Sequence, residues 1–139
     1  MTLYDRAFVT LAASADAGRA LRSRPTATVH RSNPLCGDEI ELDVIVEAER
    51  VREVAHRTDG CAITRASAAL LAELVPGLTA ADAHGLADNL EAGLARQRPL
   101  PVRLAALAEV RLLPSRRRCA LLPWSALVEA LGPNGTART

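Results

Sequence analysis

Apolar and polar residues alternate along much of the first half of the chain. From Ile40 to residue 47 every second side chain is apolar, and the residues between them are mostly acidic. This period of two is typical of a β-strand with one buried face and one face in water. A turn at residues 47–50 leads to a returning strand at 51–58, and residues 27–32 form a shorter strand before both. The pattern therefore predicts a small antiparallel meander.

The apolar spacing becomes helical after the second cysteine. Ile63, Leu70 and Leu74 share one face of a helix that ends at Pro76-Gly77. This change of period marks the transition from the sheet to a helical second half.

Three more helices are predicted in that second half. They cover residues 79–93, residues 100–110 and a final segment that begins at Cys119. Pro123 falls in the first turn of this last predicted helix, where a proline is tolerated.

The two ends of the chain are predicted to lie outside this core. Residues 1–25 contain helical apolar spacing and are predicted to hold an N-terminal helix that stops at Pro25. Residues 132–139 have the composition of a flexible tail. No repeat or linker divides residues 1–139, so they form a single domain. The predicted fold class is α+β, a small three-stranded antiparallel sheet with helices packed on one face, including N-terminal and C-terminal helices.

Composition argues against two classes of partner. The 17 basic and 16 acidic residues leave a net charge of +1, and the chain has one Trp, one Tyr and one Phe. Without a basic surplus or aromatic side chains on which bases stack, nucleic acid is not expected as a partner. No apolar stretch approaches the roughly 18 residues that span a bilayer, so no membrane partner is expected either.

The three cysteines are Cys36, Cys61 and Cys119, each in a short motif of its own. An odd number of cysteines, one of them two residues before Asp38, fits one shared metal better than disulfides. Unpaired thiols also indicate the reducing cytoplasm. Three thiolates and one carboxylate oxygen suit zinc or an iron–sulfur cluster. The alternatives are that each cysteine is a small buried apolar residue and that Asp38 caps a turn.

Side chains near the cysteines have two possible roles each. Arg116 and Arg118 belong to a basic run before Cys119, which forms either a solvated loop or a positive field that lowers the pKa of that thiol and attracts a negatively charged sulfur species. Thr64 is either an ordinary first-turn residue or a donor to a metal-bound thiolate. The histidines are expected to be structural or surface residues: His30, His56 and His84.

Three separated motifs resemble a known family. Residues 33–38 read Asn-Pro-Leu-Cys-Gly-Asp, residues 60–67 read Gly-Cys-Ala-Ile-Thr-Arg-Ala-Ser, and residues 104–127 contain the third cysteine followed by Ala. In this order they resemble the U-type iron–sulfur scaffold proteins over residues 33–131. The resemblance implies the α+β fold of that family.

Two features resemble the zinc-containing SufU branch of the family. Scaffold-proper members carry His immediately before the third cysteine, whereas this chain has Arg118, which cannot ligate a metal. The long segment at about residues 80–101 resembles the insertion that marks the SufU branch.

The resemblance implies a ligand set and a role. By this resemblance, zinc is bound by four residues of this chain, Cys36, Asp38, Cys61 and Cys119. A cysteine desulfurase is expected to deliver persulfide sulfur to Cys36. The sulfur then passes to a downstream acceptor, for iron–sulfur cluster assembly or another sulfur-using pathway. A scaffold that assembles a transient [2Fe-2S] cluster on the same ligands, and a structural zinc module that only binds partners, are the alternatives.

Overall fold

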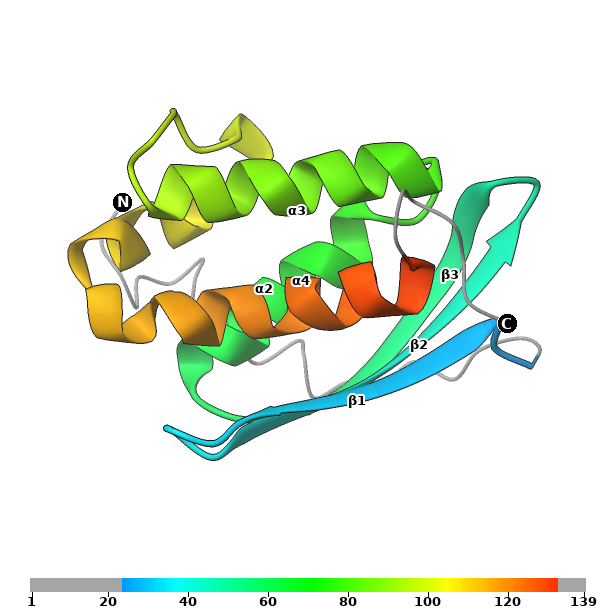
Figure 1. Cartoon of the computed structure of the whole chain (residues 1–139), viewed down its shortest axis with the longest axis horizontal. Coiled ribbons are helices and arrows are strands. Elements are labelled where there is room, and N and C mark those ends of the chain that lie inside the picture. The colour runs from blue at the N-terminus through cyan, green and yellow to red at the C-terminus, as the bar shows by residue number, and fades with distance from the viewer. Residues whose placement is uncertain (1–23, 133–139) are drawn as a thin grey trace.

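The structure is a computed structural model that describes residues 24–132 (Figure 1). The N-terminal helix predicted within residues 1–25 and the tail predicted at 132–139 therefore lie almost entirely outside the described residues. Within the described part, no helix is long and apolar enough to cross a membrane.

The predicted meander is confirmed as one antiparallel sheet of order β1-β2-β3. Its strands are β1 (Ala27–Asn33), β2 (Asp38–Glu47) and β3 (Arg50–Asp59). Asn33 pairs with Asp38 at one end of the sheet, so the first turn brings residues 34–37 to that edge.

The strand alternation is broken near the end of β2. The sequence pattern places Val46 among the buried apolar residues, but Val46 is only partly buried and Ile45 is 4% exposed. The register with β3 shifts between these two residues. The extra residue of this β-bulge lies on β3, between Val51 and Glu53, and a bulge bends and twists the paired strands locally.

The helices cover one face of this sheet (Figure 1). They are α2 (Ala62–Leu74), α3 (Ala80–Leu94) and α4 (Arg117–Leu131), with 3₁₀ segments η2 (Val102–Leu112) and η3 (Pro114–Arg116) before α4. Both α2 and α4 contact the sheet, and α3 packs on α4. This arrangement confirms the predicted α+β class.

The core fills the space between the sheet and the helices. Apolar burial of this kind is the main stabilising contribution in a domain of this size. Its largest side chains with less than 2% exposure are Trp124, Ile40, Leu42, Ile63, Leu71, Leu90, Leu94, Leu104, Leu107, Leu127 and Leu131. Trp124 therefore anchors the last helix.

Two predictions about the second half need correction. The segment predicted as a helix at residues 100–110 is the 3₁₀ segment η2, which has non-helical backbone angles at Leu104. The last helix begins at Arg117 rather than at Cys119, so Pro123 lies inside α4 and not in its first turn. A proline there has no N–H to donate to the carbonyl of Cys119, four residues earlier.

Candidate metal centre

Cys36 lies in the turn between β1 and β2 and is exposed. The backbone carbonyl of Asn33 accepts hydrogen bonds from the N–H groups of Cys36 at 3.2 Å and Gly37 at 2.8 Å. The side-chain oxygen of Asn33 accepts another from the N–H of Leu35 at 3.1 Å. Gly37 has φ of +77°, a conformation that glycine adopts without steric cost. The turn thus fixes the backbone of Cys36 and leaves the residue exposed.

Asp38 begins β2 and is 5% exposed. Its Oδ2 accepts a hydrogen bond of 2.5 Å from the Thr64 hydroxyl, and its Oδ1 accepts one of 3.2 Å from the N–H of Cys61. Gly60 lies so close that an added Cβ would be 2.8 Å from Cγ of Asp38. The carboxylate is therefore held in one place by the start of α2.

Cys119 is the third residue of α4 and is 1% exposed. Its sulfur is 3.9 Å from the sulfur of Cys36. One ligand atom from each of Cys36, Asp38 and Cys119 lies within 4.8 Å of the others, and we call these three residues the donor cluster. Two sulfurs bound to one tetrahedral zinc at about 2.3 Å would lie about 3.8 Å apart, so the spacing of the two thiols suits that ion.

Cys61 adjoins the donor cluster without belonging to it. It is the N-cap residue of α2, as the sequence predicts, and its sulfur is 3.4 Å from the Thr64 hydroxyl. It also interacts with the thiol of Cys119. The structure therefore gathers all four expected ligand residues at one end of the sheet, with three of them in the tightest group.

The charges of the site favour a bound cation. Burial alone would raise the pKa of Asp38, but hydrogen bonds from Thr64, Cys36 and Cys61 outweigh it and hold the pKa below its usual value. Burial raises the pKa of Cys119 to about 12, and the neighbouring Cys61 and Cys36 contribute to the increase. Several adjacent thiolates thus cannot coexist unless a cation compensates their charge, as in a zinc–thiolate site.

The arginines before Cys119 do not have the predicted electrostatic effect. Arg116 and Arg118 are exposed at the start of α4. The prediction that this basic run lowers the pKa of Cys119 is wrong for the metal-free chain, because burial and the neighbouring thiols raise that pKa.

The histidines lie apart from the donor cluster. His30 is exposed, and His56 is half-buried with Nδ1 2.9 Å from the Thr58 hydroxyl. His84 is half-buried rather than on the surface, with Nε2 3.2 Å from the carbonyl of Gly132. These positions agree with the structural role predicted for His56.

Two positions that sequence reasoning did not assign a role prove important to the site. Asn33 shapes the turn of Cys36, and Gly60 permits the close approach of Asp38. An Asn before Pro in a Gly-containing turn is a recognisable signal for a side chain that bonds its own backbone. The role of Gly60 depends on a residue 22 positions away, so the local sequence does not reveal it.

Comparison of the sequence with known proteins identifies a family and relatives that are about 30% identical to this chain. The family model for the NifU-like N-terminal domain matches residues 13–132. The iron–sulfur cluster assembly scaffold protein IscU of Streptococcus pyogenes serotype M1 is 32% identical over 114 residues, which are 79% of this chain and 72% of that protein. The zinc-dependent sulfurtransferase SufU of Bacillus subtilis strain 168 is 29% identical over 103 residues, which are 71% of this chain and 70% of that protein.

Solved structures support the fold. FiSufU, a candidate scaffold protein of the SUF system from Fervidobacterium islandicum AW-1, superposes with a TM-score of 0.78 at 22% identity, covering 90% of this chain and 93% of that chain. The N-terminal part of a NifU-like protein from Brucella abortus gives 0.77 at 23% identity, covering 91% and 90%. At these identities the likeness shows the shared fold. The family match over residues 13–132 and the relative at 32% identity show that the chain belongs to the NifU-like N-terminal domain family, the U-type scaffold proteins of iron–sulfur cluster assembly.

Proposed function

We propose that this protein is a zinc-dependent sulfur carrier that accepts persulfide sulfur from a cysteine desulfurase on Cys36. The observation that carries the proposal is the unequal exposure of the donor cluster. Cys36 is exposed, whereas Asp38 and Cys119 are buried. A site in which one thiol is open to a partner and the others are sheltered suits a carrier, because the exposed sulfur can react while the rest hold the metal.

The four expected ligands divide into two groups in this proposal. Asp38, Cys61 and Cys119 retain the ion, and Cys36 completes the set. Zinc, when bound, lowers the pKa of its thiol ligands so that they are thiolates at neutral pH. Zinc is also redox-inert, so it does not consume the sulfur.

The transfer step balances without an external oxidant or reductant. The Cys36 thiolate attacks the outer sulfur of the persulfide on the desulfurase. A new S–S bond forms at Cys36, the S–S bond of the donor breaks, and the desulfurase cysteine leaves as a thiolate. The persulfide on Cys36 then passes its sulfur to a downstream acceptor by the same exchange.

The surroundings of Cys36 suit a protein partner. Leu35 beside it is 76% exposed. Arg116 and Arg118 lie exposed at the start of the helix that carries Cys119. We propose that these arginines face the partner or its sulfur species, and that Thr64 supports the site from within by holding Asp38.

A cluster scaffold is the second candidate, supported by the IscU relative at 32% identity. On this alternative, iron and sulfide are the substrates assembled on the same donors, and the carboxylate corner gives a labile cluster. Arg118 favours the carrier over the scaffold, because scaffold-proper members of the family have a His at this position and an arginine cannot ligate a metal. Aerobically purified protein is expected to be colourless with about one zinc per chain. A brown protein that contains iron and sulfide would support the scaffold instead.

The role of Cys36 is tested with a cysteine desulfurase and free cysteine. Wild-type protein is expected to stimulate desulfurase turnover and to gain the mass of one sulfur atom on Cys36. Cys36→Ala is expected to abolish both effects, while His30→Ala, at an exposed position on β1 outside the donor cluster, serves as a control that retains the sulfur. Full stimulation by Cys36→Ala would exclude the acceptor role and favour the third alternative, a structural zinc module.

A further inference from the structure

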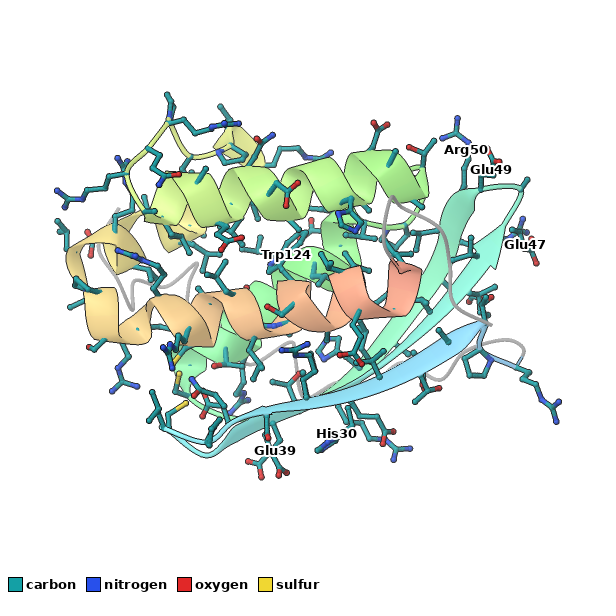
Figure 2. The ribbon with its side chains drawn as sticks, in the orientation of Figure 1. His30, Glu39, Glu47, Glu49, Arg50 and Trp124 are labelled. Carbon is teal, nitrogen blue, oxygen red and sulfur yellow. The ribbon has the colours of Figure 1, made fainter. Side chains whose placement is uncertain are left out.

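Cys119 lies in α4, and α2 begins directly after Cys61. A buried hydrogen-bond chain joins the two helices. The indole N–H of Trp124 donates to the Ser67 hydroxyl at 3.0 Å, and that hydroxyl donates to the backbone carbonyl of Ala120 at 2.5 Å. Ser67 is 0% exposed and Trp124 is 1% exposed. Figure 2 shows Trp124 on α4, facing the interior. We call this chain of two bonds the helix clamp.

The helix clamp acts next to the ligands. Ala120 directly follows Cys119, and Ser67 lies one helical turn after Thr64 on α2. Residues three apart share a helix face, so Ser67 and Thr64 point in similar directions. Thr64 holds the side chain of Asp38, and Ser67 holds the backbone beside Cys119. One face of α2 thus contacts the proposed ligand Asp38 and the residue that follows the proposed ligand Cys119.

The start of α4 needs support from another element. Arg116, its N-cap residue, makes no side-chain capping bond. Pro123 has no N–H, so the carbonyl of Cys119 lacks its usual partner within the helix. Two of the bonds that normally order a first helical turn are therefore missing at Cys119. The bond from Ser67 goes to the next carbonyl, that of Ala120, and so ties this turn to α2 from outside the helix.

We propose that Ser67 is a positioning residue that sets the place of the Cys119 thiol relative to Cys61, Cys36 and Asp38. Ser67 contacts neither the metal nor the transferred sulfur. This inference rests on the proposed metal site. Losing the Ser67 hydroxyl loosens the first turn of α4, so the Cys119 thiol is held less firmly at the distance that the other ligands require.

Three variants separate this role from general stability. Ser67→Ala removes the bond to Ala120. Trp124→Phe removes only the indole donor and keeps that bond. Thr79→Ala removes the N-cap of α3, whose hydroxyl accepts from the N–H of Asp82 at 3.0 Å, and so destabilises a helix that carries no ligand.

The measurements are zinc affinity, by competition with a chromophoric chelator, and the absorption spectrum of the cobalt(II) form. Ser67→Ala is expected to weaken zinc binding about 10- to 100-fold, the usual cost of losing a partner outside the ligand shell. Its thiolate-to-cobalt band is expected to change in intensity. Trp124→Phe and Thr79→Ala are expected to keep the wild-type spectrum and affinity, whatever their stability.

Alkylation of the metal-free chain gives a readout that needs no metal. The Cys119 thiol is 1% exposed, so it reacts slowly with iodoacetamide, and Ser67→Ala is expected to accelerate that reaction. A wild-type alkylation rate, zinc affinity and cobalt spectrum in Ser67→Ala would overturn the inference. If the wild-type chain itself binds neither metal, the proposed function fails, and the alkylation rate still decides whether Ser67 positions Cys119.

A poorly folding variant would still give a result. If metal-free Ser67→Ala is unfolded, its spectrum at saturating cobalt(II) decides. A wild-type spectrum would overturn the proposal, because the site would then have assembled without the helix clamp. A changed spectrum supports it.

Discussion

Gly60→Ala should loosen the metal site while leaving the backbone unstrained. An alanine Cβ at this position would lie 2.8 Å from Cγ and 3.0 Å from Oδ1 of Asp38, closer than non-bonded atoms approach. The carboxylate is the group that must move. Because Thr64 and the N–H of Cys61 hold its two oxygens, moving it breaks at least one of those bonds.

The size of the effect follows from those bonds. A hydrogen bond to a charged group contributes roughly 1.5–3 kcal/mol. Losing one at Asp38 should lower zinc affinity about 10- to 100-fold, which is also the range found for residues that orient metal ligands. The metal-free chain should lose a similar part of its free energy of unfolding, because the same bonds tie the start of β2 to α2.

The assay compares Gly60→Ala with a glycine that has room for a methyl group. An added Cβ at Gly85, within α3, meets nothing within 4 Å. Gly85→Ala should therefore keep wild-type zinc affinity and stabilise the helix by about 0.5–1 kcal/mol. Zinc competition titrations and urea unfolding of both variants provide the comparison. Wild-type zinc affinity in a folded Gly60→Ala protein would refute the claim that Asp38 is held as a ligand.

Three further predictions concern stability. Cys119→Ala should abolish the dependence of the melting temperature on zinc, because the free energy of metal binding is also folding free energy, on the order of 10 kcal/mol in small zinc domains. A chelator should then lower the melting temperature of the wild type and leave that of Cys119→Ala unchanged. An equal drop in both proteins would count against a structural contribution of the metal. Burial lowers the pKa of His56, so as the pH falls below about 6.5 the unfolded metal-free chain takes up a proton that the folded chain resists. Its free energy of unfolding should therefore decrease from pH 7.5 to pH 5, and His56→Gln should decrease less; parallel pH profiles would show that His56 is not responsible. In the β2–β3 turn, Ala48 and Glu49 have φ of 51° and 66°. Replacing them with Asn and Gly should therefore raise the free energy of unfolding by about 1 kcal/mol and move the urea midpoint upward. An unchanged midpoint would contradict the proposed strain.

The sheet was predictable because its signal is local. The alternation from Ile40 and the change of period after Cys61 depend on neighbouring residues alone, and both elements appear where expected. The bulge at Ile45 was not predictable in this way, since it depends on pairing with β3. The sequence likewise gives no sign of the start of α4, because no capping residue precedes Arg117. The helix was therefore predicted to begin two residues late, at Cys119, and Pro123 was wrongly assigned to its first turn.

The site was predictable only in its ligands. Three cysteine motifs and Asp38 predict a shared metal, and the structure brings Cys36, Asp38 and Cys119 together with Cys61 beside them. The supporting residues act over long separations: Thr64 on Asp38, and Ser67 on Ala120 across 53 positions. No local pattern in a single sequence encodes such a pair. Their roles become visible only when α2 and α4 are packed together.

The placement of Cys36 in a hairpin turn, apart from the two helices, has an evolutionary consequence. If the proposed function holds, changes at Pro34 or Leu35, both exposed, would alter how a donor protein approaches without disturbing the buried residues proposed to retain the ion. Partner choice and metal retention could then diverge independently in descendants of this chain. Such modularity would let one ancestral architecture serve several sulfur-trafficking routes.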